Sequence, residues 1–127
     1  MSQPTRIMYK PIKISLQVPK ELDGSPQVIL TMRPPETNDV ILAQKQSRII
    51  AEGNLVDDNA EHEAHLFANL TNTTREFIGS LAQYDYLQLQ KAYDCFLLPI
   101  PQFAARSALL FPSSVEASPS KSSDDLA

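Results

Sequence analysis

The sequence is poor in the residues that build common catalytic and ligand sites. Its 127 residues include three glycines, two histidines, one cysteine and no tryptophan. Gly24, Gly53 and Gly79 lie far apart, so they cannot form the glycine-rich loop that cradles a phosphate. The lone Cys95 excludes an intramolecular disulfide and fits a reducing compartment. These absences argue against nucleotide-binding enzymes and disulfide scaffolds.

Long apolar runs are also missing. None approaches the roughly 20 residues that a membrane-spanning helix needs, and the first residues lack the apolar core of a secretory signal. We therefore expect neither feature. Residues 1–50 carry a charge balance of +3 and residues 51–127 one of -7, which together give -4. A basic N-terminal part and an acidic C-terminal part suit a protein that docks on other proteins. The basic residues are too sparse for nucleic-acid recognition.

Apolar and polar residues alternate over residues 12–18 and again over residues 28–32, which predicts two strands with one buried face each. Pro19 is expected to end the first strand, and Asp23-Gly24 supplies a turn. The strands then form an antiparallel hairpin with a loop of about eight residues. Because a lone hairpin is only marginally stable in water, it must pack on the helices that follow. The residues predicted to face inward are Ile12, Ile14, Leu16, Val18, Val28, Leu30 and Met32.

Helical periodicity predicts four helices after the hairpin. The first helix is expected over about 38–52, with Gly53 as its C-cap. A polar link over residues 54–59 follows. The second helix is expected over about 60–70, with Asp57-Asp58 as its N-cap. A short helix follows, through Leu81. The last helix is expected to start at Asp85, whose carboxylate caps it, and Pro99 and Pro101 stop it.

The C-terminal part, residues 99–127, has fewer residues that can be buried than the part before it. The apolar segment from Phe103 to Phe111 is expected to form a turn of helix, and from Pro112 onward almost nothing can be buried. We therefore predict an α+β fold, in which an N-terminal antiparallel β-hairpin packs on a small bundle of three to four α-helices. Residues 1–98 form the domain, and residues 99–127 form a Pro/Ser-rich, mostly disordered tail.

The stretch Glu61-His62-Glu63-Ala64-His65 resembles a metal-binding motif. A zinc protease motif needs histidines four residues apart, whereas His62 and His65 are three apart. A stable site also needs a third and usually a fourth ligand, and the chain offers no other histidine and no nearby cysteine. The favoured interpretation is a solvated helix face without a metal.

Cys95 and the aromatic residues near it also have a structural interpretation. Asp94 would raise the pKa of the Cys95 thiol, so a small buried helix residue is favoured over a nucleophile. Tyr86, Tyr93 and Phe96 recur at helical spacing, which is typical of a core face and also of a surface that grips a partner. The sequence thus predicts a protein that acts by binding a partner, with no catalytic residue and no cofactor.

Three stretches resemble the phage tail assembly chaperones of Mu-like contractile-tailed phages and prophages. Leu30-Thr31-Met32-Arg33-Pro34 followed by Asp39-Val40 is similar to the family's apolar strand, Arg-x-Pro turn and following Asp. Ala68-Asn69-Leu70-Thr71 is similar to its Ala-x-Leu-Thr helix ending. Leu81, Asp85-Tyr86, Leu89 and Phe96-Leu97 resemble the final motif, in which an Asp starts a helix that ends in Phe-Leu. The resemblance covers about residues 10–98.

The resemblance implies a non-enzymatic chaperone in the host bacterial cytoplasm. Such proteins bind the long, helical tape measure protein, keep it soluble while tube subunits polymerise around it, and are absent from the mature virion. Further partners would be the tail tube protein and other copies of the chain, without nucleic acid or membrane. Our own prediction for the contact surface combines the last helix with the apolar segment after it: Tyr86, Tyr93, Phe96, Phe103, Leu109, Leu110 and Phe111.

Other functions stay open at this point. The hairpin could add its free edge to a neighbour's sheet in a minor structural subunit of a phage tail or head-tail junction. A small regulator that binds a toxin and a metal enzyme are the remaining alternatives. Particle composition separates the structural subunit from the chaperone, because a chaperone should be missing from finished particles.

Overall fold

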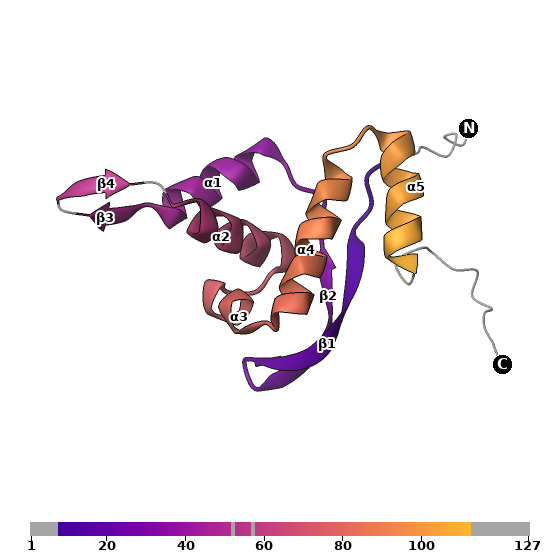
Figure 1. The fold of residues 1–127 in the computed structure, drawn as a ribbon, viewed down its shortest axis with the longest axis horizontal. Helices are drawn as coiled ribbons and strands as arrows, with labels where there is room; N and C mark the ends of the chain where they lie inside the picture. Colours follow the sequence, from indigo (N-terminus) through magenta and orange to yellow (C-terminus); the bar gives the residue numbers. More distant parts are fainter. Residues whose placement is uncertain (1–7, 52, 57, 113–127) are drawn as a thin grey trace, which may run out of the picture.

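The computed structural model describes residues 8–112 except residues 52 and 57, with the backbone alone for the strands at 49–51 and 54–56. The α+β class is confirmed, and the described residues hold five helices where three to four were expected (Figure 1). The elements in order are β1 (Ile12–Leu22), β2 (Ser25–Met32), α1 (Thr37–Ser47), β3 (Ile49–Ala51), β4 (Asn54–Val56), α2 (Asn59–Thr71), α3 (Arg75–Ser80), α4 (Gln83–Phe96) and α5 (Ile100–Leu110).

The β1–β2 hairpin is longer and more tightly closed than predicted. Its turn has only two residues, Asp23 at φ 53° and Gly24 at φ 82°, and this pair of positive values suits the twist of a two-residue hairpin. The predicted eight-residue loop is therefore wrong, and so is the end of the strand at Pro19. Pro19 lies in an irregular stretch where residues 16–19 of β1 face the single residue Val28 of β2. A proline is tolerated there because no ladder hydrogen bond requires its missing N–H.

The same irregularity changes which residues face the core. Ile12, Ile14 and Leu16 are buried as predicted, but Val18 is 44% exposed and Val28 53% exposed. The alternation was read across the register shift, where it no longer holds, because three extra residues in β1 turn the later side chains to the other face. The inward prediction for Val18 and Val28 is therefore wrong.

The first predicted helix is too long. α1 ends at Ser47, and the extended backbone of Arg48 leads into β3, which pairs with β4 as a second small hairpin. Gly53, at φ 83°, serves the turn of this hairpin and does not cap the helix. The predicted polar link over residues 54–59 is thus wrong for Asn54–Val56. Figure 1 shows the β3–β4 hairpin projecting from the end of the α1–α2 pair.

One apolar core joins the β1–β2 hairpin to α2, α3 and α4. Its most buried large side chains include Phe67 and Leu70 of α2 and Leu89 of α4, which meet Met32 and Ile14 of the hairpin. Each such side chain contributes on the order of 1.5–3 kcal/mol of apolar burial. In the described part of the chain, no helix combines the length and the apolar character that crossing a bilayer requires.

Residues Ile100–Leu110, which belong to the predicted tail, form the three-turn helix α5. Pro101 occupies the first helical turn, where proline fits because its missing N–H would have no partner. Figure 1 shows α5 beside α4 at the end of the molecule away from the β3–β4 hairpin. The rest of the predicted tail, from residue 113, lies outside the described residues.

Candidate partner-binding surface

The predicted contact residues lie on α4 and α5, and they differ in how far they are exposed. Tyr86 and Tyr93 of α4 are half-buried, and their rings lie 5.6 and 5.8 Å from the ring of Phe67. The Tyr86 hydroxyl donates a hydrogen bond to the Glu63 carboxylate, which also accepts from the Gln90 side chain at 2.8 Å. Burial, together with the bond to Glu63, raises the pKa of Tyr86 well above its ordinary value. Both tyrosines therefore help to fasten α4 to α2.

Phe96 and Phe103 form the centre of an aromatic cluster between α4 and α5. Their rings stack with centroids 5.2 Å apart, and the ring of Tyr9 meets Phe103 edge-on at 5.0 Å. Phe96 is 6% exposed and Phe103 3% exposed. The Tyr9 hydroxyl donates to the Leu98 carbonyl, which fixes the start of the described chain to the α4–α5 junction. The cluster is an apolar seam within the molecule.

The end of α5 combines a buried anchor with exposed leucines. Phe111 is buried beside the start of α4 and the middle of β1, whereas Leu109 is 76% exposed and Leu110 37% exposed. Leu97, at the joint between α4 and α5, is 63% exposed. The seven predicted residues therefore do not form one surface: Phe96, Phe103 and Phe111 are covered, and Tyr86 and Tyr93 pack against α2.

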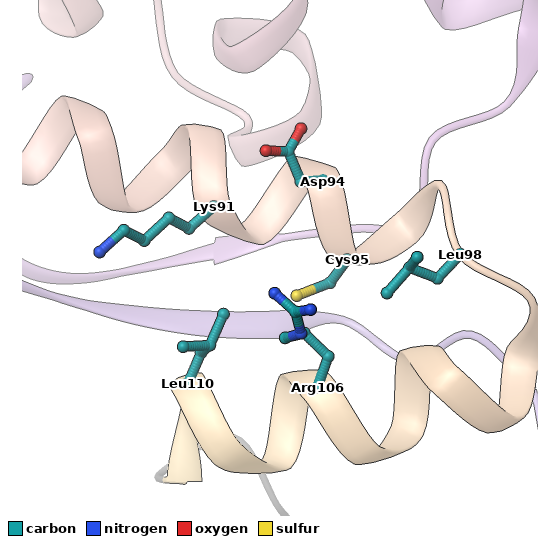
Figure 2. Close-up of a pocket in the computed structure, with 6 residues that line it drawn as sticks. All are labelled: Lys91, Asp94, Cys95, Leu98, Arg106 and Leu110. Carbon is teal, nitrogen blue, oxygen red and sulfur yellow. The ribbon is translucent and has the colours of Figure 1, made fainter.

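A small pocket lies between α4 and α5, in the part of the seam between the buried rings of Phe103 and Phe111. Its volume is about 140 Å³, and its lining comes from both helices (Figure 2). Figure 2 shows Cys95 of α4 and Arg106 of α5 pointing toward one another, with Leu98 and Leu110 at either side. The lining residues are Lys91, Asp94, Cys95, Leu98, Arg106 and Leu110. The two helices therefore pack incompletely along this seam.

Cys95 lies on the α4 side of this pocket and is only 1% exposed. Burial raises the pKa of its thiol; Arg106 opposes the change and Asp94 adds to it. The predicted interpretation of Cys95 as a small buried helix residue is confirmed. A thiol in this environment is a weak nucleophile at neutral pH.

The histidine-rich stretch lies on α2 and makes contacts between helices. The His62 ring Nε2 is 3.2 Å from the Val40 carbonyl of α1, and the His65 Nε2 is 3.8 Å from the Glu61 carboxylate. Glu61 also accepts two hydrogen bonds at 2.7 Å from Arg75, which lowers the pKa of Glu61. The helical interpretation is confirmed, but the face is half-buried rather than solvated. Among the described residues, no three His, Cys, Asp or Glu side chains are placed to hold one metal ion.

Asp85 has a role that the sequence did not reveal. It lies inside the first turn of α4, which begins at Gln83 with Ala82 as N-cap, so the predicted cap at Asp85 is wrong. Its fully buried carboxylate accepts from the backbone N–H groups of Gln17 at 2.8 Å and Val18 at 3.0 Å. These donors lie in the irregular stretch of β1 that has no ladder partner in β2. Asp85 therefore satisfies the strand and, near the positive end of the helix dipole, also suits α4.

Other capping predictions have mixed outcomes. Asp58 caps α2 as predicted, since its carboxylate accepts from the Glu61 N–H at 3.0 Å, while Asp57 lies outside the described residues. The Arg-x-Pro turn and its following Asp form one unit: the Arg33 guanidinium donates to both Asp39 oxygens, at 2.7 and 2.9 Å. The pKa of Asp39 is lowered, chiefly by these bonds. The pair closes the connection between β2 and α1.

The fold is a small α+β architecture in which α4 and α5 meet along an apolar seam. The family model described as "Phage tail assembly chaperone proteins, E, or 41 or 14" matches residues 13–98. The chain belongs to this family of phage tail assembly chaperones, as its resemblance indicated. No curated protein and no solved structure matches the chain. The matched part ends at the joint before α5.

Proposed function

We propose that the chain binds the tape measure protein during phage tail assembly, keeps it soluble, and aids assembly of the tail tube around it. Membership of the family over residues 13–98 carries this proposal. The proposed role is non-enzymatic and is performed in the host bacterial cytoplasm, with the protein absent from the mature virion. The tail tube protein and further copies of the chain are additional proposed partners.

The proposed contact surface is the α4–α5 side of the molecule. Two features support this choice. Leu97, a large apolar side chain at the joint of the two helices, is exposed there, and the seam between the helices is only partly filled and holds a cluster of three aromatic rings. A client with apolar helices needs such adaptable apolar contact, while the net charge of -4 helps to keep the complex soluble.

Co-expression with the tape measure protein tests the proposal. The tape measure protein should be soluble and co-purify with the wild-type chain, and should precipitate when expressed alone. Leu97→Glu places a charge on the proposed surface and should reduce capture about tenfold. Val28→Glu is the matched control, because Val28 is similarly exposed but lies on β2. Equal capture by both variants, or loss only in Val28→Glu, would place the contact elsewhere.

A minor structural subunit is the second candidate, and one observation favours it. β2 forms one edge of a two-stranded sheet, and both Val28 and Ile29 are about half exposed on it. Such an edge can pair with a strand of a neighbouring subunit. Mass spectrometry of purified particles separates the two candidates, since a structural subunit is present at a fixed copy number and the chaperone is absent.

A further inference from the structure

Helix α5 covers an apolar face of the part of the chain that matches the family. The family match ends at residue 98, and α5 begins at Ile100. What α5 covers belongs to the matched part: Phe96 and Cys95 on α4, which are 6% and 1% exposed with α5 in place. Without α5, this face of α4 would be open to the solvent or to a partner.

The contacts of α5 are concentrated at its two ends. At its start Phe103 stacks on Phe96 and meets Tyr9, and just after its end Phe111 is buried near β1. Between these anchors the pocket of about 140 Å³ leaves Arg106 and Cys95 incompletely packed (Figure 2). Incomplete packing loses dispersion contacts, so α5 is expected to dock more weakly than a core helix.

We infer that the face of α4 under α5 is a docking groove for an amphipathic helix of the client, and that α5 is its resident occupant, which the client displaces. The inference rests on the proposed chaperone function and names the groove and the kind of segment it receives. α5 itself demonstrates that a helix fits there. Its anchors, Phe103 within α5 and Phe111 just after its end, are eight residues apart, so the client segment needs two large apolar side chains at a similar spacing.

The resident helix also explains how the chain stays soluble before it meets its client. An open groove would expose Phe96 and its neighbours, and a large exposed apolar face promotes aggregation. A covering segment that is weaker than the client prevents this and still allows exchange. Most of the outward residues of α5 are small or polar, with Leu109 and, to a smaller extent, Leu110 as the large apolar exceptions.

Cys95 offers a direct measure of whether α5 opens, because it is the only cysteine in the chain and lies under α5. The probe is the reaction of the full-length chain with a disulfide reagent that reports thiol release. Phe103→Ala with Phe111→Ala removes both anchors and should accelerate the reaction about tenfold or more, with the circular dichroism of α1–α4 retained. Leu109→Ala changes an exposed residue of the same helix and should leave the rate unchanged.

A second variant protects the test against a failure of the first to fold. Ala105→Pro breaks α5 in its middle at an exposed position, so it unfolds α5 without removing a core side chain. It should give the same fast reaction. A synthetic peptide of residues 99–112 added to either variant should slow the reaction again, whereas a peptide with alanine at both anchor positions should not. Reaction rates equal to that of the wild-type chain in both variants, or no protection by the peptide, would overturn the groove.

The client is tested with the same variants and the tape measure protein. The variant without anchors should capture it at a lower chain concentration than the wild type, about threefold or more, and the 99–112 peptide should compete. Leu109→Glu should capture normally, because the outer face of a displaced helix is not used. Loss of capture in Leu109→Glu would show that the client binds the outside of docked α5, which overturns the inference but keeps the chaperone function. If no version captures the tape measure protein, the proposed function fails, and the thiol and peptide results still decide whether the groove receives a helix.

Discussion

The matched part of the chain and helix α5 are secured by different kinds of contact. Within residues 13–98, side chains with charge fasten the places where elements meet: Asp85 binds β1, Arg33 binds Asp39, and Arg75 binds Glu61. At α5 the contacts are aromatic rings at two ends with a pocket between them. Directional hydrogen bonds specify one arrangement, whereas apolar contacts allow one helix to replace another. The comparison separates a fixed framework from an exchangeable cover.

The largest expected effect compares a buried ring of the framework with one of the two anchors of α5. Phe67→Ala removes a fully buried ring of the framework and should lower the free energy of unfolding by about 4 kcal/mol. Phe103→Ala removes a ring that is almost as buried, yet should cost only about 1.5 kcal/mol, because α5 can undock and the loss cannot exceed its docking free energy. Urea unfolding of both variants measures this. Equal losses would make α5 part of the framework.

Asp85→Asn should have the next largest effect, a loss of about 3 kcal/mol. The amide keeps only one acceptor oxygen and directs a donor at a backbone N–H, so either the Gln17 or the Val18 N–H faces a donor in place of an acceptor. Asp94→Asn is the matched control on the same helix, since Asp94 is exposed. Thermal and urea unfolding measure the change, and hydrogen exchange at Gln17 and Val18 locates it. A loss as small as that of the control would contradict the role assigned to Asp85.

Asp85 also shows which features of the fold the sequence can predict and which it cannot. Periodicity found the hairpin, α2 and α4, because their buried positions recur regularly on one face. It failed where the chain departs from regularity: the three extra residues of β1 and the partner of Asp85, 67 or 68 positions away, have no local signal. An aspartate at the start of a helix usually caps that helix, so Asp85 was predicted to be the N-cap of α4.

The C-terminal side teaches the opposite lesson. The apolar content of residues 103–111 predicted a turn of helix, but the two prolines before it were read only as the end of the preceding helix, so the full length of α5 was missed. The first turn of a helix tolerates proline, and tertiary contact through Phe103 supplies the rest. The seven contact residues were predicted as one surface because the last helix has an aromatic face at helical spacing and an apolar segment follows it. Their division into covered anchors and exposed leucines depends on how α5 lies on α4, which no periodicity reports.

The pair of Arg33 and Asp39 should make stability depend on acid. The folded pKa of Asp39 is lowered below an unfolded value of about 3.9, so its contribution is complete above that value and disappears as the pH falls through the folded pKa. Arg33 is 48% exposed, and solvent screening limits the effect to about 1 kcal/mol. Between pH 5 and pH 2, roughly the window of this titration, the wild type should lose about that much more stability than Asp39→Asn. Glu21→Gln, at an exposed position of β1, should follow the wild type; parallel curves for wild type and Asp39→Asn would remove the pair from the framework.

The smallest expected effect comes from Gly79, where two terms oppose each other. A Cβ at Gly79 would lie 2.6 Å from a guanidinium nitrogen of Arg75, so the alanine variant displaces the flexible end of Arg75 and weakens its pair with Glu61. Alanine in a helix gains about 0.5–1 kcal/mol over glycine, and a partly exposed pair contributes about as much. Gly79→Ala alone should therefore change the free energy of unfolding by less than about 0.5 kcal/mol. In a Glu61→Gln background the pair is already weakened, so the same substitution should stabilise by about 0.5 kcal/mol or more. A double-mutant cycle by urea unfolding measures the difference, and a coupling of zero would mean that Arg75 contributes nothing to the junction of α2 and α3.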